Sequence, residues 1–261
     1  MRSLAIGATG MLAQQLNVET ISNNIANATT TGFKKQRAEF QDLLYQNFRR
    51  IGSTSSDAGT VVPTGVQVGA GVRVAAVGRI LEQGNLTVTD NKLDVAVNGS
   101  GYFQVLLPSG ETAYTRAGNF KLSPEGIIVT ADGYQLQPAI TVPAEATDVA
   151  INSSGEVLVK LDGQVAQQNV GQIQLSTFAN AAGLEAIGDN LFLQSTASGE
   201  AVGGNPGAPG FGRLVQGALE TSNVNIVQEI TTLISAQRAY EMNSKVIKTT
   251  DEMMQAATQL R

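Results

Sequence analysis

The hydrophobic residues of this chain change their spacing twice along its length. Near the N-terminus they recur every seven residues, at Leu4, Met11, Val18 and Ile25. The same step returns near the C-terminus, at Ile226, Leu233, Tyr240, Ile247 and Met254. Such a step places apolar side chains along one face of an α-helix. The pattern therefore predicts helices over residues 3–31 and 224–260.

Between these ends the spacing is that of β-strands. Alternate positions are apolar or small at Val66, Val68, Ala70, Val72 and Val74. Short apolar runs follow at 93–97, 102–107, 112–115, 127–130, 148–151, 156–161, 171–178 and 191–194. Turn dipeptides such as Asn98-Gly99 and Asp132-Gly133 separate the runs. Many short strands joined by tight turns predict an antiparallel β domain from 61 to about 219.

The order of helix, β region and helix predicts an α+β fold with long N- and C-terminal helices. Residues 1–45 and 221–261 are expected to form a coiled-coil-like inner domain, joined through an extended stretch at 46–75 to a central β domain at 76–220. The C-terminal helix would be roughly 55 Å long. Its apolar row is either an internal core stripe or an assembly seam. Because so long a helix seldom finds an equal partner inside a 27.2 kDa chain, we favour assembly.

The segment 33–50 is basic and punctuated by aromatic residues. A 3–4 spacing predicts that a helix resumes here, with one face formed by Phe33, Arg37, Phe40, Leu44 and Phe48. The basic side chains are interpreted as a solvated face, the alternative being contact with an anionic polymer: Lys34, Lys35, Arg37, Arg49 and Arg50. Gly7 and Gly10 should weaken the first helix, since each costs up to ~1 kcal/mol against alanine.

Composition excludes several classes of function. The chain has no His and no Cys, which rules out a Ser-His-Asp triad, a thiol nucleophile and structural zinc. A net charge of −5 argues against a broad nucleic-acid-binding surface. Asp90 and Asp94 lack calcium-loop spacing, so neither a metal nor a cofactor is expected. No membrane span and no cleavable signal peptide are recognised.

Four stretches of the chain resemble the bacterial flagellar rod and hook proteins. The N-terminal signature of that family is similar to Ser22-Asn23-Asn24-Ile25-Ala26-Asn27 followed by Thr31-Gly32-Phe33-Lys34. Its central motif resembles 93–103, which Tyr114-Thr115-Arg116-Ala117-Gly118-Asn119-Phe120 continues. Its C-terminal signature resembles 221–225 and 237–245. The length of the chain and its segment 46–75 most resemble the members that form the distal rod.

The resemblance implies a structural subunit of a hollow helical homopolymer, which transmits torque from motor to hook and serves as an export conduit. It implies contacts with further copies, proximal rod proteins, the hook protein, the P and L ring proteins and the flagellar export apparatus. It implies neither nucleic acid nor a small-molecule substrate. The location would be the periplasm-spanning rod of the basal body, reached by export without a cleaved signal peptide.

The resemblance also places the terminal signatures in the surfaces through which subunits assemble. The candidate interface residues are Leu4, Met11, Val18, Asn23, Asn24, Ile25, Asn27, Ile226, Leu233, Tyr240, Ile247 and Met254. The asparagines would fix packing register between helices, as a buried Asn does in coiled coils, or else form a solvated face. A competing hypothesis is a carboxylate-based enzyme acting on peptidoglycan, with Glu82 and Asp90 as its acidic pair.

Overall fold

In the computed structural model, which describes residues 2–52, 64–162 and 166–259, the chain forms two compact units. The helical unit comprises Met1–Ile25, Gln36–Gly78 and Ile226–Arg261. The β unit comprises Ala26–Lys35 and Arg79–Asn225. The predicted α+β class, with a helix at each end and an antiparallel β domain between them, is confirmed. No helix among the described residues combines the length and apolarity needed to cross a membrane.

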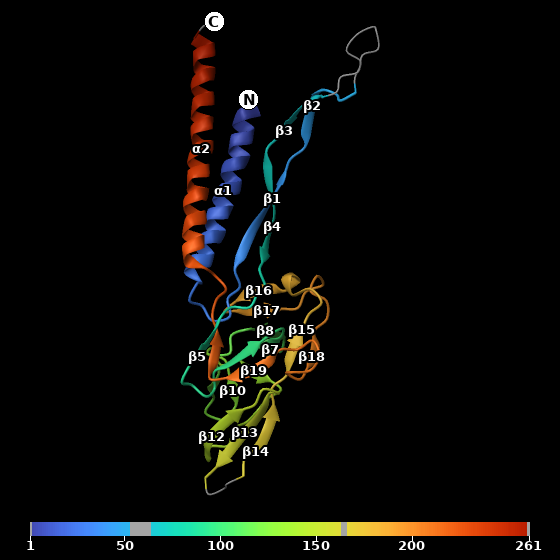
Figure 1. The fold of residues 1–261 in the computed structure, drawn as a ribbon, viewed down its shortest axis with the longest axis vertical. Coiled ribbons are helices and arrows are strands. Elements are labelled where there is room, and N and C mark those ends of the chain that lie inside the picture. Colours follow the sequence, from blue (N-terminus) through green and yellow to red (C-terminus); the bar gives the residue numbers. More distant parts are fainter. Residues whose placement is uncertain (1, 53–63, 163–165, 260–261) are drawn as a thin grey trace. The chain divides into compact units, whose positions relative to one another are not determined.

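Two long helices dominate the helical unit. Helix α1 spans Arg2–Ala26 and helix α2 spans Ile226–Gln259, and the two lie side by side (Figure 1). They run in opposite directions, because Gly7 lies against Ile247 while Asn24 lies against Glu229. Helix α1 ends before the predicted residue 31, since residues 27–32 form a turn. Helix α2 thus has an internal partner, contrary to the expectation from its length.

Small residues let the two helices approach closely. A Cβ atom on Gly7 would lie 2.9 Å from Ile247 Cγ1, and one on Gly10 would lie 2.8 Å from Asn243 Nδ2. The glycines that lower the helix propensity of α1 therefore admit side chains of α2. Their cost in backbone entropy is offset by packing that a larger residue would prevent.

Replacing Gly7 by leucine should loosen α1 from α2. Leucine raises helix propensity by about 0.8–1 kcal/mol, but overpacking a close contact costs typically 1–3 kcal/mol, so we expect a net loss. Limited proteolysis should cut α1 sooner in Gly7→Leu than in the parent chain. The control is Ala5→Leu on the exposed side of the same helix. Equal cleavage rates in the two variants would contradict this account of the glycines.

A two-stranded ribbon completes the helical unit. Strand β1 (Gln36–Asp42) pairs with β4 (Val72–Arg79), and β2 (Tyr45–Arg49) pairs antiparallel with β3 (Val66–Gly69). The strand prediction at 66–74 is confirmed, whereas the helix predicted within 33–50 is wrong. The backbone of this segment pairs with strands 17 or more residues away, and this long-range pairing overrides the 3–4 spacing. The predicted linker at 52–60 lies largely outside the described residues.

The β unit is built from short strands. Its largest sheet has nine strands, in the order β16-β17-β8-β7-β11-β10-β9 with β15 and β18 beside β7. Separate sheets are β12-β13-β14, β19-β6 and β20-β5. Their bounds are β5 Leu86–Val88, β6 Val95–Asn98, β7 Tyr102–Leu106, β8 Thr112–Thr115, β9 Lys121–Leu122, β10 Ile128–Val129, β11 Gln135–Gln137, β12 Ala146–Ile151, β13 Glu156–Leu161, β14 Gln168–Gln172, β15 Leu175–Thr177, β16 Glu185–Gly188, β17 Leu191–Leu193, β18 Val202–Gly204, β19 Arg213–Gln216 and β20 Ala218–Glu220. Each apolar run predicted from 93 to 194 contributes residues to a strand.

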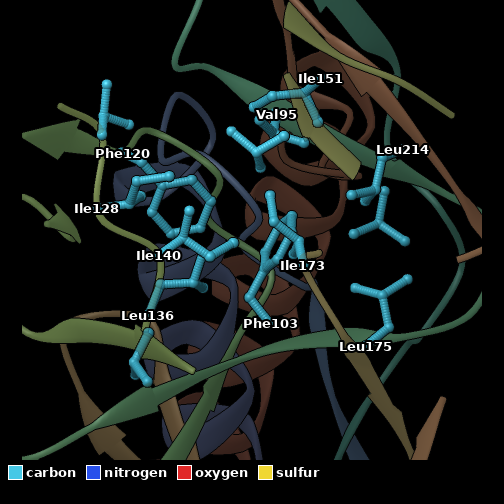
Figure 2. Packing of buried hydrophobic residues seen from close by; sticks show 14 of the residues in the cluster. Val95, Phe103, Phe120, Ile128, Leu136, Ile140, Ile151, Ile173, Leu175 and Leu214 are labelled. Carbon is cyan, nitrogen blue, oxygen red and sulfur yellow. The ribbon is translucent and has the colours of Figure 1, made fainter. Parts of the chain in front are cut away.

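The hydrophobic core of the β unit lies between these sheets. Figure 2 shows its aromatic and aliphatic side chains meeting, including Phe103, Phe120, Ile140 and Ile173. The rings of Phe103 and Phe120 meet edge to face, with centroids 5.0 Å apart. The tight turns between strands use left-handed glycines, such as Gly99 at φ 110° and Gly133 at φ 86°. The motif stretches at 31–34 and 221–225 belong to this unit.

Candidate assembly site

A buried ion cluster inside the β unit joins two of the motif stretches, through Lys34 and Arg116, to Glu220, the residue directly before a third. Lys34 Nζ lies 2.6 Å from Glu220 Oε1, and Arg116 Nε lies 2.8 Å from Glu220 Oε2. The side chains are almost inaccessible, at 4% exposure for Lys34, 6% for Arg116 and 0% for Glu220. Two cations therefore share one carboxylate at a point where residues more than 180 positions apart meet.

Backbone groups add further hydrogen bonds to this cluster. Lys34 Nζ also donates to the carbonyl of Glu82 at 2.8 Å, and Arg116 Nη1 donates to that of Gly101 at 2.6 Å. The amide of Gly84 donates to Glu220 Oε1 at 2.9 Å. The interpretation of Lys34 as part of a solvated face is thus wrong. Its charge is buried because a carboxylate from the C-terminal stretch reaches it, which local composition does not reveal.

The cluster shifts the pKa values of its members. Burial opposes ionisation of Glu220, but the charge of Arg116 together with the hydrogen bond and charge of Lys34 outweighs it, and the pKa of Glu220 is lowered. Burial also lowers the pKa of Lys34, against the hydrogen bond and charge of Glu220. The folded chain therefore holds the Glu220 carboxylate ionised at pH values where the unfolded chain takes up a proton.

Acid should destabilise the β unit through Glu220. Because its pKa is lowered on folding, its contribution is fully present above the ordinary glutamate pKa of 4.5 and is lost as pH falls through the lowered value. Urea unfolding of the parent chain should show stability falling across that window. In Glu220→Gln the fall should be shallower. An identical pH slope in the two proteins would contradict this assignment.

Asn223 and Gly32 hold the chain segments beside the cluster. Asn223 Oδ1 accepts the amide of Lys35 at 2.7 Å, and its Nδ2 donates to the carbonyls of Ile80 and Glu82 at 3.0 Å each. The amide of Gly32 donates to the carbonyl of Glu220 at 2.8 Å. Gly32 has φ 70°, and a Cβ there would lie 2.9 Å from the Arg116 carbonyl carbon. The motif residues thus fix the entry and exit of the terminal segments.

In the helical unit, the side-chain carboxamide of Asn24 pairs with the backbone of Gln36 as a neighbouring strand would. Its Nδ2 donates to the carbonyl of Gln36 and its Oδ1 accepts the amide of Gln36, both at 2.8 Å. Its Nδ2 also lies 3.1 Å from Glu229 Oε2 on α2. Asn24 and Glu229 are both buried. One carboxamide therefore ties α1, the ribbon and α2 together, within a single chain.

The other candidate interface residues are only partly covered by their own chain. Asn23 is exposed, while Asn27 is half-buried in the turn after α1, where its Oδ1 accepts from Thr30. Ile226 and Tyr240 are exposed by 46% and 42%. Half-buried are Leu4, Met11, Val18, Ile25, Leu233, Ile247 and Met254. The role of these residues in contacts between copies stays a prediction.

Further apolar residues of α2, absent from the predicted set, are also exposed. One group comprises Val227, Ile230 and Ile234, and the other comprises Met242, Val246 and Met253. At about 100° per residue, the two groups fall on opposite flanks of the stripe that faces α1. The ribbon exposes a third set: Phe40, Leu44, Tyr45, Phe48, Ile51, Val66, Val68, Val74 and Val77. Steps of three, four or seven residues separate the members of each helical group in the sequence, and this helical spacing could have revealed them.

Comparison with known proteins identifies the family. Three family models match: flagella basal body rod protein over residues 4–34, flagellar hook protein FlgE/F/G D1 domain over 96–159, and flagellar basal body rod FlgEFG protein C-terminal over 215–260. The flagellar basal-body rod protein FlgG of Caulobacter vibrioides is 64% identical over the full length of both chains. The chain belongs to the flagellar basal-body rod protein family. The proteins of that name from Agrobacterium fabrum and Bacillus subtilis are 51% and 40% identical, over at least 97% of each chain.

This rod protein is a structural subunit of the flagellar distal rod and not an enzyme. The resemblance found in the terminal and central motifs is confirmed. The hypothesis of a carboxylate-based enzyme is wrong. Asp94 illustrates the structural use of acidic residues here, because it accepts hydrogen bonds from Thr89 Oγ1 at 2.7 Å and Asn91 Nδ2 at 2.8 Å.

Proposed function

We propose that the subunit polymerises through its helical unit, with neighbouring copies covering both flanks of α2. The observation that carries this is the exposed apolar side chains on those flanks, at Ile230 and Ile234 on one and Val246 and Met253 on the other. Contiguous exposed apolar surface typically marks an interaction site. A surface present on two opposite sides of one helix suits a repeating arrangement, in which each copy contacts two others.

The driving force for polymerisation would be burial of the apolar surface that the single chain leaves exposed. Fully burying one isoleucine or valine side chain is worth roughly 1.5–3 kcal/mol, and these residues are already about half covered. Several such contacts at each repeat offset the loss of freedom of one added subunit. This proposal includes the coiled-coil-like character of the inner domain. It also includes the division of the chain into an inner domain of 1–45 plus 221–261, an extended stretch at 46–75 and a central β domain at 76–220.

The assembled product would be a hollow helical tube with terminal helices inside and β units outside. It would transmit torque from motor to hook and pass exported proteins along its lumen. Its partners would be proximal rod proteins, the hook protein, the P and L rings and the export apparatus. It would span the periplasm after export without a cleaved signal peptide. Support comes from family membership, since the relatives are basal-body rod proteins.

Electron microscopy of the concentrated full-length protein tests this proposal. We expect helical tubes whose diameter is constant and whose number rises steeply with concentration. Sedimentation velocity on the same samples should show loss of monomer as tubes appear. A protein that stays monomeric throughout, with no ordered assemblies in the images, would contradict self-assembly.

A further inference from the structure

A pocket of about 320 Å³ opens in the β unit beside the ion cluster. Exposed residues Leu81, Gln83 and Ser100 line it together with the buried side chains of Lys34 and Arg116. Aromatic walls come from Tyr102 and Phe178, whose ring centroids are 5.9 Å apart. The pocket thus combines two buried cations with an apolar lining.

The charges around this pocket do not balance. Lys34 and Arg116 face a single carboxylate, Glu220, which leaves one positive charge in excess. None of the described residues that line the pocket is acidic. The excess occurs in a chain whose net charge is −5, so it is a local feature and not a property of the whole surface. A buried uncompensated cation attracts an anion strongly, because little solvent screens it.

The hydrogen-bond donors of the two cations also outnumber their acceptors. An ammonium has three N–H groups and a guanidinium has five. Lys34 donates to two acceptors, Glu82 and Glu220, among the described residues. Arg116 donates to three, Glu220, Gly101 and Val97. Among the described residues, one N–H of Lys34 and two of Arg116 thus have no acceptor of their own, and both side chains line the pocket.

We propose that this pocket binds a small monocarboxylate carried on a short apolar stem. A single negative charge matches the single excess positive charge, and the carboxylate oxygens would accept the available N–H groups of Lys34 and Arg116. The stem would lie against Tyr102, Phe178 and Leu81. This binding goes beyond the rod function, since it requires neither polymerisation nor another subunit.

Thermal unfolding of the full-length protein in sodium butyrate tests the proposal. Butyrate should raise the melting temperature progressively over sodium chloride of equal ionic strength, because a ligand of the folded state shifts the equilibrium by mass action. Butyramide, which has the same stem without the charge, should give no rise. Equal melting temperatures in butyrate and chloride would overturn the proposal, as would an equal rise with butyramide.

A matched pair of variants locates the site. Ser100 is exposed and lines the pocket, so Ser100→Glu places a tethered carboxylate at its mouth. We expect Ser100→Glu to lose the butyrate-dependent rise and Ser100→Gln to keep it. An undiminished butyrate effect in Ser100→Glu would overturn the assignment to this pocket. The outcome is independent of assembly, because it is measured on the monomer.

Discussion

Replacing Ile230 and Ile234 together by lysine should abolish tube formation while leaving the monomer folded. Each side chain is 45% exposed in the single chain, so the monomer should lose no more than about 1 kcal/mol of stability. In the tube the same lysines would place two charges in an apolar contact, at a cost of several kcal/mol unless they reach water. Because every copy carries the defect, it recurs at each contact. Sedimentation and thermal melting measure the two effects separately.

Val88→Lys is the control for added charge. Val88 is 83% exposed on strand β5 of the β unit and belongs to neither flank of α2. Tubes should form with Val88→Lys, and cells that carry it should stay motile. If the double variant assembled normally, the flank would bury nothing. If it failed to fold, the flank would instead be part of the monomer core.

Glu220→Gln should destabilise the β unit by about 3–5 kcal/mol, because it leaves two buried cations without their carboxylate. The glutamine retains the size of the side chain, so the loss reports charge and not a cavity. Urea unfolding monitored by circular dichroism measures it. The glutamine oxygen can still accept a hydrogen bond from Lys34, but the amide nitrogen in place of Glu220 Oε2 cannot accept one from Arg116.

The exposed ion pair of Lys92 and Asp148 provides the contrast. Its atoms are also 2.6 Å apart, but the side chains are 63% and 46% exposed. Solvent screening limits such a pair to about 0–1 kcal/mol, so Asp148→Asn should hardly change stability. Comparable losses in Asp148→Asn and Glu220→Gln would show that burial does not set the strength of the cluster.

Local patterns were sufficient for the two helices, for the strands of the β unit predicted from 93 to 194 and for the part of the ribbon at 66–74, but not for its strands β1 and β2. The strands of the β unit coincide with short apolar runs that turn dipeptides separate, and both are local signals. The segment 36–49 carries a helical spacing instead, yet Gln36 bonds to Asn24 and β2 bonds to β3. Such pairing depends on residues distant in sequence, so it cannot be recognised from the residues of one short stretch.

The candidate site shows the same division between local and distant information. A search for apolar rows selected Ile226, Tyr240 and their heptad neighbours, but the row most buried against α1 is polar or small: Glu229, Ala236, Asn243 and Thr250. Close approach at Gly7 and Gly10 makes such a contact possible. Similarly, the motifs include Lys34, Arg116 and the residues after Glu220. Only the fold shows that the two cations share the carboxylate of Glu220.

Maleimide labelling of a single introduced cysteine tests the central claim, that copies meet along the flanks of α2. The natural chain has no cysteine, so Ile234→Cys would carry the sole thiol. Leu122→Cys, on an exposed strand of the β unit, serves as the reference. We expect Cys at 234 to react readily in the monomer and to be protected in assembled tubes, with the reference reactive in both. Unchanged reactivity at 234 after assembly would contradict the account.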